Sequence, residues 1–273
     1  MNAGTDLSTL AIDIHNRSKV ALLSDSNLRA QVDFFLDQGF VVLRGCVDPE
    51  TVNSLKNRVA TGFGGSLPCT YWDSDGNKKI SLFSPDLIQK RELKILDAHA
   101  VDSIAQQAIF APPIRTFLEA VFGTTPVAFQ SLAFIKGSEQ PAHDDRTFVP
   151  VHPPGNFIAS WIALERIVTG SGELLYYPRS HLLPPHVFQN GTLSQWRPEE
   201  LHNYSPTVVE KATRAGLSVD YFFAEAGDVL LWHSSLLHGG APIKNPQLTR
   251  YSFVTHYCPT FSVPSHAKTA RCQ

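Results

Sequence analysis

The sequence predicts a mainly β protein with flanking helices, in which at least six short strands form a barrel or a double-sheet jelly roll. Two observations predict this fold class. The 17 glycines and 19 prolines are spread among apolar runs, which is typical of a loop-rich β fold and not of a helical bundle. From about residue 126 onwards, apolar segments of strand length follow one another with short turns between them.

The first 125 residues are expected to form a mostly helical lead-in that packs against the sheet. Four apolar residues at helical spacing predict a helix over 28–36, and the apolar run 40–44 predicts a strand after it. A second helix begins at Asp48-Pro49-Glu50, because an N-cap residue is followed by proline in the first turn and by an acid near the positive end of the helix dipole. A further helix is predicted over 113–122.

The strands of the predicted core lie between residues 126 and 260. They are expected at 127–135, 157–164, 173–177, 219–223, 228–233 and 250–257. An insert at 182–218 carries prolines and two weak helical patterns, so we interpret it as an excursion from the sheet. This insert and a Gly-, Ser- and Asp-rich loop at 61–79 are candidates for lids that exclude water. Since no internal repeat or low-complexity linker is present, one domain is expected over 1–273.

Composition and charge favour a cytoplasmic enzyme or binding protein. Lysine and arginine (23) nearly balance aspartate and glutamate (25), so no nucleic-acid or membrane partner is expected. No apolar run approaches the ~18 residues of a membrane span, and the N-terminus lacks the basic and apolar regions of a signal peptide. The four cysteines contain no C-x-x-C pair and are expected to be free thiols. The oligomeric state is left open.

The run Pro141-Ala142-His143-Asp144-Asp145 carries the first chemical signal. On a strand, residues i and i+2 share a face, so His143 and Asp145 would point the same way while Asp144 points the other way. One imidazole and one carboxylate on a common face are two of the three ligands of a 2-His-1-carboxylate iron site.

Two histidines in the segment 227–240 are candidates for the third ligand. His238 precedes a Gly-Gly pair, where a strand can end and leave room for a bound molecule beside the backbone. His233 lies among apolar neighbours. A hydrogen-bonded structural histidine is the alternative for either residue.

A predicted strand beginning at Arg250 adds a candidate anion site. By strand alternation Arg250 and Ser252 share one face. A guanidinium with an adjacent hydroxyl suits a carboxylate, because it offers two parallel charge-assisted hydrogen bonds and one more donor. A structural salt bridge is the alternative for Arg250, since an arginine on an apolar strand needs an anionic partner.

These residues together resemble the phytanoyl-CoA dioxygenase-like family of iron(II)- and 2-oxoglutarate-dependent oxygenases. The resemblance covers most of the chain, and its elements occur in the family's order. They are the lead-in 37–45 with the helix that begins at Asp48, then His143-Asp144-Asp145, Trp161-Ile162-Ala163-Leu164, Gly172-Glu173-Leu174, Tyr177-Pro178-Arg179-Ser180-His181, Gly227-Asp228, His238 and Arg250. The resemblance implies a double-stranded β-helix core, the jelly roll of cupin-like proteins, with an N-terminal helical layer.

Residue by residue, the resemblance implies an iron site and a co-substrate pocket. His143, Asp145 and His238 match the metal ligands, and Arg250 matches the arginine that holds the distal carboxylate of 2-oxoglutarate. Further residues expected to contact the co-substrate are Trp161, Gln130 and Ser252. The implied cofactors are Fe(2+), 2-oxoglutarate as co-substrate, and O2.

Three positions depart from the family's usual pattern without removing a metal ligand. Asp144 stands where the family often has glutamine, and it adds an acid near the metal. Gly240 replaces a serine that is common two residues after the distal histidine, and Arg179 replaces the glycine of a Pro-Gly-Ser-His turn. An aspartate at position 145 favours hydroxylation, because halogenating relatives have a small residue there.

The implied activity is that of a dioxygenase that hydroxylates, or otherwise oxidises, a C–H bond of a small organic substrate while 2-oxoglutarate is decarboxylated to succinate and CO2. Arg146 and Arg179 are candidates to bind an anionic group on that substrate, and a solvent-exposed or salt-bridged arginine is the alternative for each. Dry, apolar walls are expected from Phe134, Trp161 and Trp232. Two other classes fit part of the pattern: a cupin-type metal enzyme that does not use 2-oxoglutarate, and a catalytically inactive binding module on the same fold.

Overall fold

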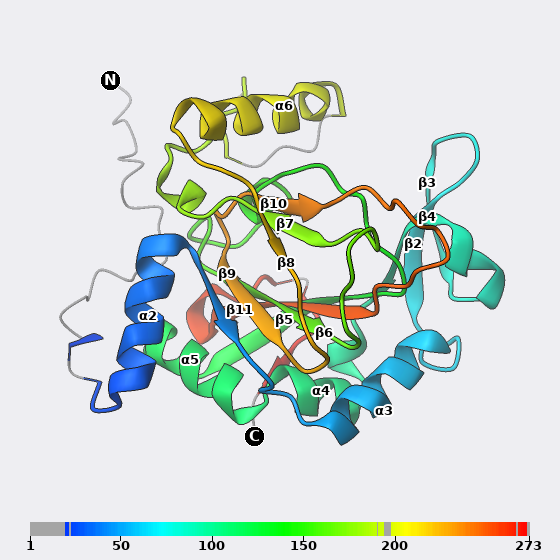
Figure 1. The fold of residues 1–273 in the computed structure, drawn as a ribbon, viewed down its shortest axis with the longest axis horizontal. Coiled ribbons are helices and arrows are strands. Elements are labelled where there is room, and N and C mark those ends of the chain that lie inside the picture. Colours follow the sequence, from blue (N-terminus) through cyan, green and yellow to red (C-terminus); the bar gives the residue numbers. More distant parts are fainter. Residues whose placement is uncertain (1–19, 22, 190, 194–197, 266, 272–273) are drawn as a thin grey trace.

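Two antiparallel sheets form the centre of the structure, a computed structural model that describes residues 20–271 except 22, 190, 194–197 and 266. The larger, nine-stranded sheet has the strand order β1-β9-β6-β11-β5-β4-β2-β3, and β12 also pairs with β5. The smaller sheet has the order β10-β7-β8 and lies next to the larger one (Figure 1). The prediction of a mainly β protein is confirmed.

The strands of the larger sheet come from both halves of the chain. They are β1 (Phe40–Leu43), β2 (Pro68–Trp72), β3 (Lys78–Leu82), β4 (Arg91–Leu96), β5 (Pro126–Phe134), β6 (Ile158–Ala163), β9 (Val229–His233), β11 (Ser252–Pro259) and β12 (Ala270–Arg271). The smaller sheet consists of β7 (Leu174–Tyr176), β8 (Asp220–Phe222) and β10 (His238–Gly240).

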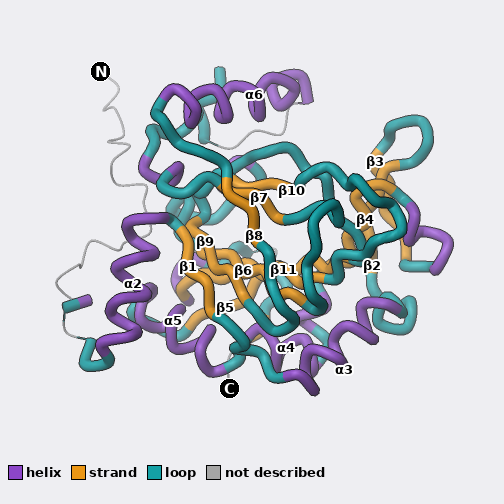
Figure 2. Tube along the Cα trace, in the orientation of Figure 1, coloured by secondary structure: helices purple, strands orange, loops and turns teal. Residues whose placement is uncertain are grey.

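Four helices cover the outer face of the larger sheet, as Figure 2 shows. They are α2 (Ser26–Gln38), α3 (Pro49–Ala60), α4 (Ser103–Ile109) and α5 (Pro112–Phe122). Their apolar residues pack with the outward-facing side chains of the sheet into one core cluster. A fifth helix, α6 (Pro198–Arg214), lies on the opposite side of the molecule (Figure 1). None of the described helices is long and apolar enough to cross a membrane.

The helices predicted over 28–36 and from Asp48 are present as α2 and α3, and capping groups explain their starts. The Asp25 side chain accepts hydrogen bonds from the first backbone N–H groups of α2, and Gly39 ends that helix at φ 82°. The Asp48 side chain accepts a hydrogen bond from the Thr51 N–H at the start of α3. These local signals fixed both helices because capping satisfies backbone groups that would otherwise have no partner.

The expectation of a mostly helical lead-in was incomplete, because this region also contains β1 to β4. In particular, the predicted loop at 61–79 contains β2 and the start of β3, joined by a turn at 73–77 in which Asp73 accepts hydrogen bonds from the Asp75 and Asn77 N–H groups. Pairing of β4 with β5 adds these strands to the sheet. The alternation in such short strands is weak, and they are stabilised by the β2–β3 hairpin and by the pairing of β4 with β2 and β5.

The insert at 182–218 contains one helix where two weak patterns were predicted. Helix α6 runs through Pro206. Its apolar face packs in a cluster of its own with residues of the insert and of the chain near β10; the buried members are Phe188, Tyr204, Val208, Ala212 and Leu237. The insert is therefore anchored to the strand that carries His238.

The Gly227-Asp228 motif joins the lead-in to the core. Asp228 accepts hydrogen bonds from the Gly45 N–H (2.8 Å) and from the Arg44 guanidinium (2.6 Å). Gly227 has φ +88°, and a Cβ at this position would lie 2.5 Å from the Val47 carbonyl oxygen. Only glycine fits here, because both the backbone angle and the close approach exclude a side chain.

We expect Gly227→Ala to lower the free energy of unfolding by about 2–4 kcal/mol, because it adds a backbone clash to left-handed strain. Gly76→Ala is the matched control: Gly76 also has a positive φ (+75°), but a Cβ there meets nothing within 4 Å. The control should lose only about 1–2 kcal/mol. Denaturant unfolding of both variants measures the difference, and equal losses would contradict the role assigned to the contact with Val47.

Candidate metal centre

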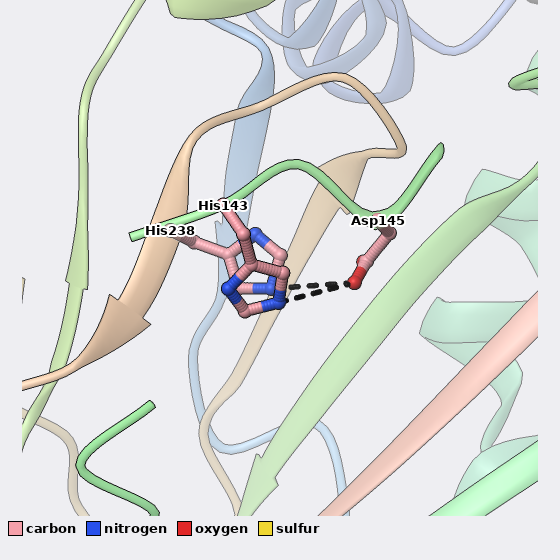
Figure 3. Close-up of side chains that lie close together, drawn as sticks. All are labelled: His143, Asp145 and His238. Atoms are coloured by element: carbon pink, nitrogen blue, oxygen red, sulfur yellow. Dashed lines mark ion pairs between the residues drawn. The ribbon is translucent and has the colours of Figure 1, made fainter. Parts of the chain in front are cut away.

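His143, Asp145 and His238 lie together, and one potential ligand atom from each is within 4.8 Å of the other two (Figure 3). His238 begins β10, whereas His143 lies in the segment that follows β5. The two histidines are joined by reciprocal backbone hydrogen bonds of 2.9 Å, from each N–H to the other's carbonyl oxygen. This bridge places both rings side by side, with their centroids 4.5 Å apart.

Local hydrogen bonds set the tautomer of both histidines. The Nδ1 of His143 lies 2.8 Å from the Pro141 carbonyl oxygen, and that of His238 lies 3.0 Å from the Leu236 carbonyl oxygen. A carbonyl oxygen can only accept, so each Nδ1 carries the hydrogen and each Nε2 has a lone pair, which in His143 accepts a hydrogen bond from the Gln140 amide (3.2 Å). Both Nε2 atoms point toward Asp145 Oδ1, at 3.7 and 3.5 Å.

The second oxygen of Asp145 is held by residues of the larger sheet. Trp232 Nε1 donates a hydrogen bond to Oδ2 (2.9 Å), and His256 Nε2 lies 3.5 Å from the same oxygen. Ala159 pairs with Trp232 on one side and with His256 on the other, so the three form one row across β9, β6 and β11. The small Ala159 leaves space between the two rings, and Oδ1 stays available to a metal.

The protonation states also suit a divalent cation. Burial, together with the neighbouring His238, lowers the pKa of His143 to about 3, so its ring is neutral at pH 7. Burial would raise the pKa of Asp145, but the surrounding histidines outweigh it and keep this pKa well below its usual range. Neutral imidazoles and an ionised carboxylate are the forms that bind a metal.

Asp144 points away from the three candidate ligands, toward α6. Its carboxylate accepts a hydrogen bond from the Tyr204 hydroxyl (3.0 Å) and pairs with the Arg146 guanidinium (3.3 Å). The Tyr204 hydroxyl also accepts a hydrogen bond from the Asp144 N–H (3.1 Å). The residue that is unusual for the family thus attaches the insert helix to the segment that carries His143 and Asp145.

A second group of buried polar atoms lies around Arg250. The guanidinium donates to the Gly172 carbonyl oxygen (2.8 Å) and lies 5.6 Å from the ring centroids of both Phe134 and Trp161. Burial lowers its pKa only to about 10, so it stays cationic. Within the described residues no carboxylate lies within 4 Å of it, which removes the structural salt bridge as its explanation.

Three buried donors in this group have no hydrogen-bond partner. They are Arg250 Nε, Ser252 Oγ and Trp161 Nε1. Buried donors without partners are rare, because each retains the free-energy penalty of its lost hydration. This group therefore fits a bound carboxylate, and the three residues are among those that the sequence predicted for the co-substrate.

Lys94 is a residue of the site that the sequence did not reveal. Its Nζ donates to the Gln140 Oε1 (2.8 Å), and the Gln140 amide lies 3.2 Å from His143 Nε2. Burial lowers the pKa of Lys94, and the charges of Asp145 and Arg250 act on it as well. Lys94 lies on β4, a strand with no recognisable pattern in the sequence, so its inward direction could not be predicted.

Two predicted candidates do not join these groups. His233 is excluded as a ligand, because its Nδ1 accepts a hydrogen bond from the Ser235 N–H (3.0 Å) and its ring lies against His181. Gln130 pairs across the sheet with His256, whereas Ser252 pairs with Phe134, four positions further along β5. Gln130 is therefore about 13 Å along the strand from the Arg250 group.

The two departures from the family pattern other than Asp144 also have structural explanations. A Cβ at Gly240 would lie 2.6 Å from Ser138 Oγ and 2.7 Å from the Glu139 nitrogen, so no serine fits there. Arg179 keeps the left-handed backbone of the glycine it replaces (φ 68°) and pairs with Asp37 at 2.7 Å. Since Arg146 and Arg179 both have acidic partners within the chain, they give no support to an anionic substrate group.

Comparisons with known proteins agree with this geometry. The profile of the family described as phytanoyl-CoA dioxygenase (PhyH) matches residues 35–252. A phytanoyl-CoA dioxygenase domain-containing protein 1 from Danio rerio is 27% identical over 186 residues, which are 55% of this chain and 64% of that protein. The Mus musculus protein of the same name is 30% identical over 87 residues, 30% of each chain. The chain thus spans less than two thirds of these relatives.

Solved structures show the same fold. The epimerase SnoN, crystallised with Fe3+, alpha ketoglutarate and nogalamycin RO, superposes with a TM-score of 0.65 at 17% identity over 88% of both chains. EctD from S. alaskensis superposes with a TM-score of 0.63 at 18% identity, over 85% of this chain and 77% of EctD. The prediction of a jelly-roll core with flanking helices is confirmed.

We expect Asp145→Ala to abolish tight binding of Fe(II), while Asp144→Ala retains it. Asp145 offers an oxygen to the metal, whereas Asp144 faces Tyr204 and Arg146. Metal content after dialysis of both variants measures this difference. Loss of iron from Asp144→Ala alone would refute the assignment of the carboxylate ligand.

Trp232→Phe should weaken metal binding by about 10-fold or more, because it removes the hydrogen bond that orients Asp145 while it keeps an aromatic ring in place. Trp161→Phe removes an indole N–H near Arg250 and should leave metal affinity unchanged. Anaerobic titration with Fe(II) gives both affinities. An unchanged affinity in Trp232→Phe would show that the hydrogen bond does not orient the ligand.

Proposed function

Because the chain belongs to the phytanoyl-CoA dioxygenase family, we propose that it is a non-haem Fe(II)- and 2-oxoglutarate-dependent oxygenase of a small organic substrate. The observation that carries the proposal is the pairing of two groups inside one fold. A preoriented 2-His-1-carboxylate set lies in the same fold as a buried arginine whose neighbours include unpartnered donors. Neither group alone would identify the reaction class.

His143, Asp145 and His238 would hold the iron through their Nε2 and Oδ1 atoms, and such a facial set leaves positions open for other ligands. When bound, the iron would supply the redox chemistry that couples decarboxylation of 2-oxoglutarate, to succinate and CO2, to oxidation of a substrate C–H bond by O2. SnoN and EctD crystals that contain alpha ketoglutarate or 2-oxoglutarate support this choice of co-substrate.

The protein residues around the co-substrate would supply charge and exclude water. Arg250 would bind the distal carboxylate of 2-oxoglutarate, with Ser252 and Trp161 as the additional donors. Lys94 is half-buried and bonds Gln140, whose amide lies against His143, so it would help to position that side of the metal site. Phe134 and Trp161 flank the Arg250 guanidinium and keep that end of the pocket dry.

Hydroxylation is the outcome we favour, because Asp145 occupies the position that would have to be small for halogenation. The neighbours nevertheless include an enzyme described as an epimerase and one described as a carbocyclase. The outcome of the oxidation therefore depends on how the substrate is placed, and the proposed class includes oxidations other than hydroxylation.

The two other classes explain less of the structure. A metal enzyme that does not use 2-oxoglutarate has no need for a buried arginine beside unpartnered donors. An inactive binding module has no need for two histidines whose tautomers both leave a lone pair on Nε2. Both remain distinguishable from the proposed oxygenase by one spectroscopic experiment.

We expect anaerobic protein mixed with Fe(II) and 2-oxoglutarate to show the weak visible charge-transfer band of the chelated co-substrate. Arg250→Ala should raise the concentration of 2-oxoglutarate needed for half of the band by about 10-fold or more, since a charge-assisted pair is lost. Arg179→Ala, which removes an exposed arginine paired with Asp37, is the control and should not change it.

Absence of the band in the unmodified protein, or its persistence in Asp145→Ala, would refute the proposed function. Succinate formation from 2-oxoglutarate in air, without added substrate, provides an independent measurement of the same activity.

A further inference from the structure

A cavity of about 370 Å³ opens next to the candidate metal centre. Its lining is mainly aromatic and apolar, with a carboxylate, an amide and an ammonium group among the walls. The residues are Asp97, Phe129, Gln130, Phe148, Val149, Pro150, Pro264, Ala267 and Lys268. This volume is near the lower limit of small-molecule sites, which favours a compact metabolite.

Two lining residues connect the cavity to the metal ligands. The Phe148 ring meets the His143 ring edge to face, with centroids 5.3 Å apart. Gln130 is the cross-strand neighbour of His256, and His256 lies 3.5 Å from Asp145 Oδ2. Both ring nitrogens of His256 are buried without a hydrogen-bond partner. A molecule in this cavity would therefore lie beside the metal centre.

A β-bulge shapes the inner wall. The pairing of β11 with β5 passes from His256–Gln130 to Tyr257–Ala128, so Phe129 has no partner. Bulges redirect side chains near functional sites, and here the Phe129 ring lies parallel to the His256 ring at 6.0 Å. The wall formed by Phe129 and Phe148 suits the apolar body of a ligand.

The two charged groups of the cavity flank one histidine. Asp97 and Lys268 both act on the pKa of His99, in opposite directions, and burial lowers that pKa so that His99 is neutral at pH 7. His99 is held by Ser131 Oγ (2.9 Å) and by the Lys268 carbonyl oxygen (2.8 Å). Among the described residues, neither charge has an ion-pair partner within 4 Å.

The backbone of Asp97 is held in a left-handed conformation at the edge of the cavity. It has φ 58°, a left-handed angle uncommon for residues other than glycine, and its N–H donates to the Ser131 carbonyl oxygen (2.9 Å). The same Ser131 anchors His99, one position beyond Gln130 on β5. An acid held in this way at an aromatic cavity is suited to an ammonium group, which also interacts favourably with ring faces.

We propose that this cavity binds the substrate, and that the substrate is a compact zwitterion of the α-amino-acid type with an apolar side chain. The ammonium group would bind to Asp97, the carboxylate to Lys268, and the apolar side chain to Phe129 and Phe148, on the metal side of the cavity. The statement that the bound molecule is a substrate rests on the proposed oxygenase function. Its binding to the cavity can be measured without turnover.

Calorimetric titration of the protein under anaerobic conditions tests this, with Fe(II) and 2-oxoglutarate present and, separately, with neither. The probes are leucine, proline and phenylalanine, each as the free amino acid, the N-acetyl derivative and the carboxamide. We expect at least one free amino acid to bind about tenfold or more tightly than both of its blocked forms, because each blocked form loses one charge-assisted contact.

Charge variants locate the binding. Asp97→Asn should remove the preference for the free amine over the N-acetyl form, and Lys268→Gln should remove the preference for the free carboxylate over the carboxamide. The exposed Asp33 and Lys90, whose side chains lie outside the cavity lining, supply the matched controls Asp33→Asn and Lys90→Gln. Both controls should bind all three forms as the unmodified protein does.

The inference is overturned if no free amino acid binds, if the blocked forms bind equally well, or if the two cavity variants behave like the controls. These outcomes are separate from the proposed function. The charge-transfer band and uncoupled succinate formation would still appear in that case, whereas charge-selective binding without either signal would refute the oxygenase and leave the cavity assignment standing.

Discussion

The reciprocal backbone hydrogen bonds between His143 and His238 are the contact on which the rest of the site depends. They join a segment after β5 to β10, the edge strand of the smaller sheet, and so place two rings from distant parts of the chain side by side. Because the bridge uses only backbone groups, the nitrogen atoms of both side chains remain available for other contacts. Each ring then bonds a nearby carbonyl oxygen through Nδ1 and keeps Nε2 for a metal.

The larger sheet supports this bridge from the other side. Trp232, Ala159 and His256 lie in one row across three strands, and the two large members reach the same oxygen of Asp145. A tryptophan expected from the sequence to be an apolar wall is in fact a hydrogen-bond donor to the candidate ligand. One oxygen of the carboxylate is therefore bound to the sheet, and the other is directed at the two histidines.

The polar groups inside the jelly roll fall into separate regions with different roles. One region, at one end of β5 and β11, consists of Arg250, Ser252 and Trp161. Its unpartnered donors fit a bound carboxylate. Gln130 and His256 lie at the other end, next to the cavity that contains Asp97. Asp144 faces outward and binds α6 through Tyr204. The insert therefore contacts the metal-binding segment directly.

Local sequence signals determined the elements that depend on local physics. The caps at Asp25, Gly39 and Asp48 set the ends of α2 and the start of α3, and the long apolar runs set β5, β6 and β11. The spacing of His143 and Asp145 also indicated the candidate ligands: these residues are not in a strand, but the extended backbone of Asp144 gives the same alternation locally. The short strands β2, β3 and β4 escaped prediction, since their alternation is weak and they join the larger sheet only through the pairing of β4 with the distant β5.

Tertiary structure alone decided the rest. Residue patterns left His233 and His238 both open, and only the family resemblance pointed to His238; in the structure it is the His238 ring that faces Asp145. The roles of Asp144 and Lys94 depended on contacts with Tyr204 and Gln140. Likewise, Gln130 was separated from Arg250 by the register of β5 and β11. In each case the residue type was visible in the sequence, but the direction of the side chain is set by long-range pairing, which no local pattern encodes.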